Sequence, residues 1–118
     1  MSEPAPAASP SLAARIPPAE LATLRRALLA RGHAIATKLA ALLAGAKPMT
    51  IIRALGLDLK PGARPEEILR RALDDVEAQR KQLEADDDRY GRCTTCGVAL
   101  DLALLREVPW ADRCHAHG

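Results

Sequence analysis

Three cysteines and one histidine near the C-terminus have the types and spacing of metal ligands. Cys93 and Cys96 form a C-x-x-C pair, and Cys114 and His117 form a C-x-x-H pair after a spacer of seventeen residues. Thiolate sulfur and imidazole nitrogen are ligands that Zn²⁺ takes in a tetrahedron of four. The pattern therefore predicts a zinc ion bound by Cys93, Cys96, Cys114 and His117.

The predicted site is structural, because four protein ligands leave no open position on the ion for water or substrate. Arg92 and Arg113 directly precede Cys93 and Cys114. Cations beside thiols favour the deprotonated form that binds a metal.

Two alternatives concern the ligands themselves. His115 is a rival for the fourth position, although ligands adjacent in sequence to Cys114 are geometrically awkward and the C-x-x-H spacing favours His117. Cys93 and Cys96 could instead be a redox pair, but the βαβ pattern that usually surrounds such a pair is missing.

The elements that must position these ligands are predicted to be helices. The 118 residues include no Phe, one Tyr and one Trp, and the apolar content is mostly Ala and Leu. Leu and Ala favour helix.

Residues 1–15, rich in Pro, Ala and Ser, are expected to be a disordered arm. A first helix begins at Pro17-Pro18 and runs to about Ala44, with an apolar stripe at steps of three, four and seven: Leu21, Leu24, Leu28, Ile35, Leu39 and Leu42. Its weak point is Arg31-Gly32-His33, where a break is possible.

A second helix is predicted from Pro65 to about Asp86–Asp88, since Pro65 suits a first helical turn and acids follow it. Residues 45–64 connect the two helices. Thr50 is expected to cap a short helix over 51–55, and the apolar residues there either fold back or form a contact surface. The expected fold class is mainly α: an antiparallel helical hairpin, or coiled coil, over residues 16–88, followed by a small zinc finger over residues 89–118.

Charge and composition exclude several classes of protein. No apolar run is long enough to cross a bilayer, and the Pro-rich N-terminus does not resemble a signal peptide, so we expect a cytoplasmic protein. The net charge is +2, with nine Lys/Arg against three Asp/Glu in residues 1–64 and eight against twelve in residues 65–118. This asymmetry predicts complementary helix faces or an outside partner for the basic half. No nucleophile–base set or phosphate loop is visible, so we expect no enzyme.

The C-terminal sequence resembles the DksA/TraR zinc-finger family of bacterial transcription regulators. The resemblance rests on Tyr90-Gly-Arg-Cys-Thr-Thr-Cys-Gly97, the aliphatic residues that follow, and Arg106-Glu-Val-Pro-Trp-Ala-Asp-Arg-Cys114. It implies a zinc finger beside an antiparallel coiled coil that binds RNA polymerase, inserts its tip into the secondary channel, and reads no specific DNA sequence.

Two departures from the family pattern affect what the resemblance implies. His117 stands where the family has a fourth cysteine. The acidic tip motif Asp-x-x-Asp-x-Ala is missing, and the tip offers Asp58 alone among four cations: Lys47, Arg53, Lys60 and Arg64. A zinc-binding adaptor that contacts another protein through the apolar connection 48–59 is therefore the second hypothesis. A nucleic-acid binder using the basic first half is the third, disfavoured by the scarcity of aromatic residues.

Overall fold

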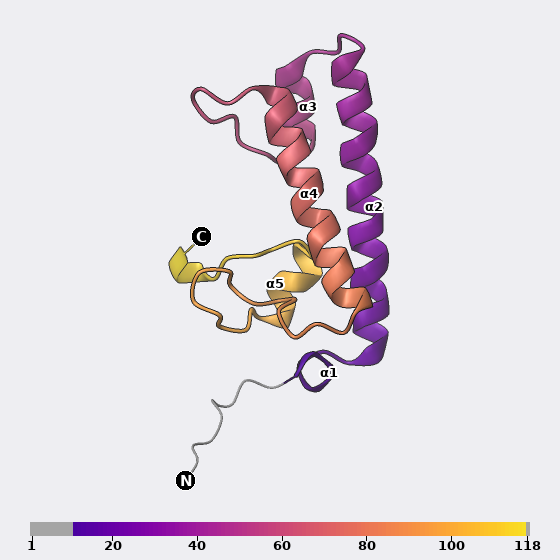
Figure 1. Ribbon diagram of the computed structural model, residues 1–118, viewed down its shortest axis with the longest axis vertical. Helices are drawn as coiled ribbons and strands as arrows, with labels where there is room; N and C mark the ends of the chain where they lie inside the picture. The colour runs from indigo at the N-terminus through magenta and orange to yellow at the C-terminus, as the bar shows by residue number, and fades with distance from the viewer. Residues whose placement is uncertain (1–10, 118) are drawn as a thin grey trace.

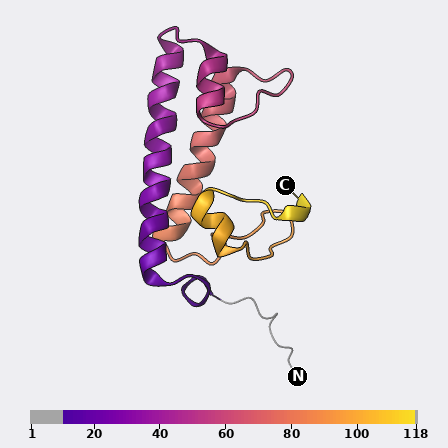
Figure 2. The same ribbon diagram turned by 180° about the vertical axis from the view of Figure 1, so that it is seen from behind.

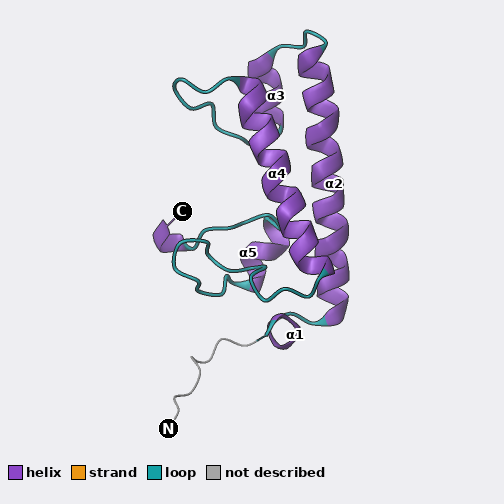
Figure 3. Ribbon diagram, in the orientation of Figure 1, coloured by secondary structure: helices purple, strands orange, loops and turns teal. Residues whose placement is uncertain are grey.

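A computed structural model describes residues 11–117, which are mainly helical (Figure 3). The helices are α1 (Leu12–Arg15), α2 (Pro18–Leu43), α3 (Pro48–Ala54), α4 (Pro65–Glu84) and α5 (Leu102–Glu107), and a 3₁₀ turn covers His115–His117. Within the described residues there is no extended strand, only an isolated antiparallel bridge between Arg92 and Ala99.

Two long helices, α2 and α4, pack side by side in opposite directions and form the long axis of the molecule (Figures 1 and 2). At about 1.5 Å per residue, α2 is about 39 Å long. Its buried face, Leu24, Leu28, Gly32 and Ile35, follows the helical period. The buried face of α4 consists of Leu69, Val76, Gln79 and Leu83. The prediction of two packed long helices is confirmed.

No break occurs at the predicted weak point of α2, so that expectation is wrong. Gly32 is buried against α4, and a Cβ on it would lie 3.2 Å from Glu77 Oε2. Arg31 donates a hydrogen bond of 2.7 Å to the carbonyl of Leu55 and stacks 4.1 Å from the ring centroid of Trp110. Tertiary contacts thus hold Gly32 and Arg31 in the helix, although both residues weaken it locally.

The connection between the long helices contributes some residues to the core and exposes others. Pro48 begins α3 with Lys47 as its N-cap, so Thr50 lies inside the helix and the predicted Thr50 cap is wrong. Ile51, Ile52 and Leu55 are buried. The side chains of three other apolar residues in or beside the connection stay exposed: Leu43, Met49 and Leu59.

The expected disordered arm over residues 1–15 needs a correction. Residues 1–10 lie outside the described part of the chain, but residues 12–15 form α1, with Leu12 and Ile16 buried. The Leu12 N–H donates to Asp88 Oδ1 at 2.8 Å, and Arg15 donates to the carbonyls of Asp88 and Tyr90. These partners are more than seventy residues away in sequence, so local composition gave no sign of them.

Ion pairs do not link the basic α2 to the acidic α4 in the part of the chain that the structure describes. Within α4, Arg80 pairs with Glu77 and Glu84, and Arg70 pairs with Glu66. The pair between different elements joins Arg106 of α5 to Glu20 of α2. The prediction of complementary helix faces is therefore not supported by direct contacts, and burial of aliphatic side chains holds the helices together.

Helices long and apolar enough to cross a membrane do not occur among residues 11–117.

We predict that Leu28→Ala lowers the free energy of unfolding by about 2–5 kcal/mol, because it leaves a cavity between α2 and α4. Leu28 is 0% exposed and its neighbour Leu29 is 58% exposed. Leu29→Ala is therefore the matched control, with an expected change within about 0.5 kcal/mol. Urea denaturation of the two metal-loaded variants measures both values, and equal losses would contradict the described helix register.

Candidate metal centre

The first two cysteines lie on a tight loop closed by backbone hydrogen bonds. The Cys93 N–H donates to the Val98 carbonyl at 2.9 Å, and the Gly97 N–H donates to the Cys93 carbonyl at 2.8 Å. Gly97 has a φ of +78°, which favours glycine. The loop therefore turns the backbone so that the side chains of Cys93 and Cys96 lie on the same side.

The second ligand pair is brought to this loop by contacts from Thr94. Its N–H donates to the Asp112 carbonyl at 2.9 Å, and its hydroxyl accepts a hydrogen bond from Arg113 Nε at 3.2 Å. The 3₁₀ turn after Cys114 places the His117 N–H 3.0 Å from the Cys114 carbonyl. Both halves of the sequence pattern thus meet through protein contacts alone.

The four predicted ligands form one cluster, and His115 is not part of it. The sulfurs of Cys93, Cys96 and Cys114 and a ring nitrogen of His117 all lie within 4.8 Å of one another. Cys96 Sγ is 3.7 Å from Cys114 Sγ, and His117 Nδ1 is 3.7 Å from Cys93 Sγ and 3.1 Å from Cys114 Sγ.

These separations fit a metal ion between the four atoms. Bonds of about 2.3 Å to sulfur and about 2.0 Å to nitrogen give a regular tetrahedron edges of about 3.8 Å between sulfurs and about 3.5 Å from sulfur to nitrogen. A disulfide needs about 2.05 Å between sulfurs, and the three cysteines are free thiols. The donor set therefore suits a metal centre better than a bridge, and the chain's own geometry is compatible with four-coordinate binding.

Hydrogen bonds lower the pKa of two of the three thiols, Cys93 and Cys114. At Cys96 the Val98 N–H lowers the pKa, but burial and the neighbouring Cys114 and Cys93 raise it above its usual value. Burial raises the pKa of the Cys93 thiol, but backbone N–H groups outweigh this effect and bring its pKa to about 5. One of these donors is the Thr95 N–H, 3.4 Å from Cys93 Sγ. The hydrogen bond between Cys114 and His117 lowers the pKa of the thiol and raises the pKa of the imidazole. Metal binding requires the thiolate and the neutral imidazole, so an ion must displace the shared proton.

Sequence reasoning assigned the stabilisation of the thiolates to neighbouring arginines, and the structure gives those side chains other partners. Arg113 donates to the Thr94 hydroxyl and to the His117 carbonyl. Arg92 donates to the carbonyls of Asp88 and Gly97. The Arg92 side chain therefore holds the loop before and after the first cysteine pair. Backbone N–H groups stabilise the Cys93 thiolate.

Two side chains that had no predicted structural role hold the cysteine-rich segment together and anchor it to α4. Tyr90 is buried and its hydroxyl donates to the Pro109 carbonyl at 2.7 Å. Gln79 of α4 donates to the Trp110 carbonyl at 2.8 Å. Trp110 is half-buried under Arg31. Gln79 lies on the buried face of α4, three residues after Val76. A polar residue at that position was the feature of the sequence that could have indicated its role.

Comparison with known proteins finds no matching family model, no similar curated protein and no similar solved structure.

We predict one metal ion per chain, with His117 and not His115 as the fourth ligand. His117→Ala should weaken metal affinity by at least about tenfold, because a ligand of the tetrahedron is lost. His115→Ala is the matched control on the same 3₁₀ turn and should keep the affinity of the wild type. Competition with a chromophoric chelator measures both, and the reverse order of effects would contradict the assignment.

Proposed function

We propose that this chain is a DksA/TraR-like regulator that holds one zinc ion and binds RNA polymerase rather than a specific DNA sequence. The observation that carries the proposal is the Cys93-Cys96-Cys114-His117 cluster, formed by the same segment whose sequence resembles that family. In this proposal α2 and α4 are the antiparallel coiled coil and residues 89–118 are the zinc finger.

Zinc is the ion that this donor set favours. Three thiolates and one imidazole around a tetrahedral centre are typical of structural zinc sites, and hard cations such as Mg²⁺ and Ca²⁺ prefer oxygen. All four positions of the ion would be taken by protein atoms. The proposed centre therefore fixes the fold of the finger, and the proposal assigns it no catalysis.

In this proposal the helical hairpin is the part of the chain that extends toward RNA polymerase. The α2–α3 turn lies at the end of the long axis away from the metal cluster (Figure 1). The tip, residues 43–64, exposes Leu43, Met49 and Leu59. It carries four cations and one acid, Asp58. A tip of this charge would approach acidic protein surfaces and would not bring carboxylates to a metal-bearing active centre.

A second candidate function is a zinc-binding adaptor that contacts another protein through the same tip. The exposed Met49 and Leu59, 42% and 44% accessible, favour it because they offer apolar surface to a partner. Ile52 and Leu55 are buried in the core and do not belong to that surface.

The test is affinity purification of the tagged chain from the cells that make it. We expect RNA polymerase subunits to be enriched with the wild type and with His115→Ala, which keeps the proposed ligands. We expect them to be lost with Cys93→Ser/Cys96→Ser, because the finger cannot hold its ion. Enrichment of another protein without RNA polymerase would contradict the regulator proposal and support the adaptor.

A second variant separates the role of the tip from that of the finger. Met49→Ser/Leu59→Ser removes exposed apolar surface and should leave thermal stability close to that of the wild type. If the tip is the contact, this variant loses the partner while keeping its zinc. A partner retained by this variant would place the contact elsewhere on the chain.

A further inference from the structure

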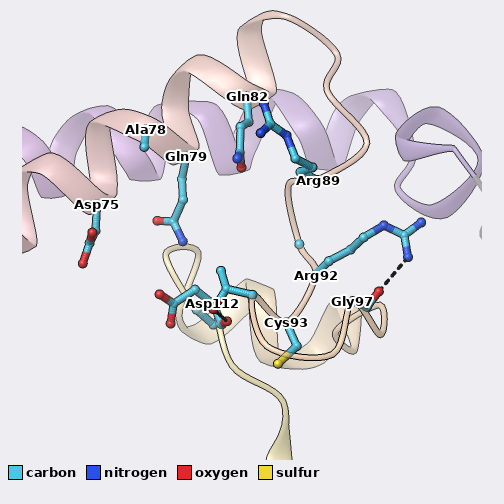
Figure 4. Close-up of a pocket in the computed structure, with 12 residues that line it drawn as sticks. Asp75, Ala78, Gln79, Gln82, Arg89, Arg92, Cys93, Gly97 and Asp112 are labelled. Carbon is cyan, nitrogen blue, oxygen red and sulfur yellow. Dashed lines mark hydrogen bonds between the residues drawn. The ribbon is translucent and has the colours of Figure 1, made fainter. Parts of the chain in front are cut away.

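A pocket of about 380 Å³ lies between α4 and the cysteine-rich segment, beside the metal cluster (Figure 4). Side chains of α4 form one wall, and residues 89–97 and 111–112 form the other. The volume is that of a small-molecule site. Ala78 and Ala111 are apolar, and most of the other lining residues have polar side chains, although apolar atoms supply most of the lining surface.

One buried acceptor in this pocket has no partner among the described residues. Gln79 is 9% exposed, and its amide nitrogen is committed to the Trp110 carbonyl at 2.8 Å. Its Oε1 is buried without a hydrogen bond. The Trp110 contact fixes the orientation of the amide, because a flipped amide would set two oxygens against each other. An unpaired buried oxygen of this kind costs about 1–3 kcal/mol unless a donor reaches it.

Two carboxylates share the pocket with this oxygen. Asp75 of α4 and Asp112 line the same pocket, and Figure 4 shows both on the side of the view where Gln79 lies. Burial raises the pKa of Asp75, and the charge of Asp112 adds to this effect while Arg71 opposes it. The nearest cation to Asp75 is Arg71, whose Nε is 3.7 Å away on an exposed side chain. Asp112 has no ion pair among residues 11–117.

The arginines around the pocket are already engaged, which disfavours an anion. Arg89 is held by both carboxylate oxygens of Asp87. Arg92 donates to the carbonyls of Asp88 and Gly97. In Figure 4 its guanidinium extends toward Gly97, away from Gln79 and Asp75. The end of the pocket near Gln79 therefore offers acceptors and negative charge.

We propose that this pocket binds an organic cation, an alkylammonium or guanidinium group, between Gln79 Oε1, Asp75 and Asp112. The N–H donors of such a group satisfy the buried amide oxygen and offset the two carboxylates at once. The alkyl part lies against Ala78 and Ala111. The same chemistry is offered by a free amine and by a Lys or Arg side chain of a partner. The site is independent of the proposed contact with RNA polymerase.

The test uses NMR titration of the ¹⁵N-labelled, metal-loaded chain. The free probes are butylammonium and agmatine, and the probe for a side chain is acetyl-Gly-Arg-Gly-amide. We expect saturable shifts of the Gln79 side-chain amide and of the Ala111 and Asp112 N–H groups. A free-amine site responds to the first two probes, and a site for a partner's side chain responds more strongly to the peptide.

Three matched carboxylate variants decide the outcome. Asp75→Asn and Asp112→Asn should each weaken binding by about tenfold, since each removes a charged acceptor. Asp74→Asn, one residue away and outside the pocket lining, should bind as the wild type does. If Asp112→Asn perturbs the spectrum of the finger, the comparison of Asp75→Asn with Asp74→Asn still stands.

Three results would overturn the proposal. The first is the absence of saturation with all three probes, which leaves water as the partner of Gln79 Oε1. The second is an equal loss with Asp74→Asn, which indicates a general response to surface charge. The third is the same shifts with Mg²⁺ alone, which indicates an inorganic cation.

Discussion

The C-terminal segment depends on four side chains from its two ends meeting at one point. Residues 89–117 contribute few apolar side chains to the core, mainly Tyr90, Cys93, Leu100 and Leu105. Burial on that scale offsets little of the entropy lost when about thirty residues become ordered. Binding of a structural zinc ion in small finger peptides supplies about 10–16 kcal/mol. The closeness of three sulfurs and one nitrogen is thus the constraint on which the rest of this segment relies.

Hydrogen bonds and one cation–π contact join this segment to the helices. The carbonyls of Pro109 and Trp110 accept hydrogen bonds from Tyr90 and from Gln79 of α4. Arg31 of α2 stacks on Trp110 and also bonds to the carbonyl of Leu55, just after α3. One side chain therefore touches the long helix, the finger and the connection.

The sequence predicted the parts of the molecule whose signals are local. Ligand spacing indicated the four residues that cluster, and helical periodicity predicted α2 and α4 because Leu24, Leu28, Leu69 and Leu83 recur on single faces. Long-range contacts were not predictable. Leu12 is buried because α1 packs against Asp88 and its neighbours. Gly32 stays helical because α4 packs on it, and Thr50 gives no cap because Pro48 already begins α3. In each case a distant partner or a competing start signal outweighed the local preference.

X-ray absorption at the zinc edge on the purified chain tests the account most directly. The account predicts a four-coordinate ion with three sulfur neighbours at about 2.3 Å and one nitrogen neighbour at about 2.0 Å. A shell dominated by oxygen and nitrogen, or one with fewer than three sulfurs, would contradict it. That result would mean that Cys93, Cys96 and Cys114 lie together for a reason other than metal binding.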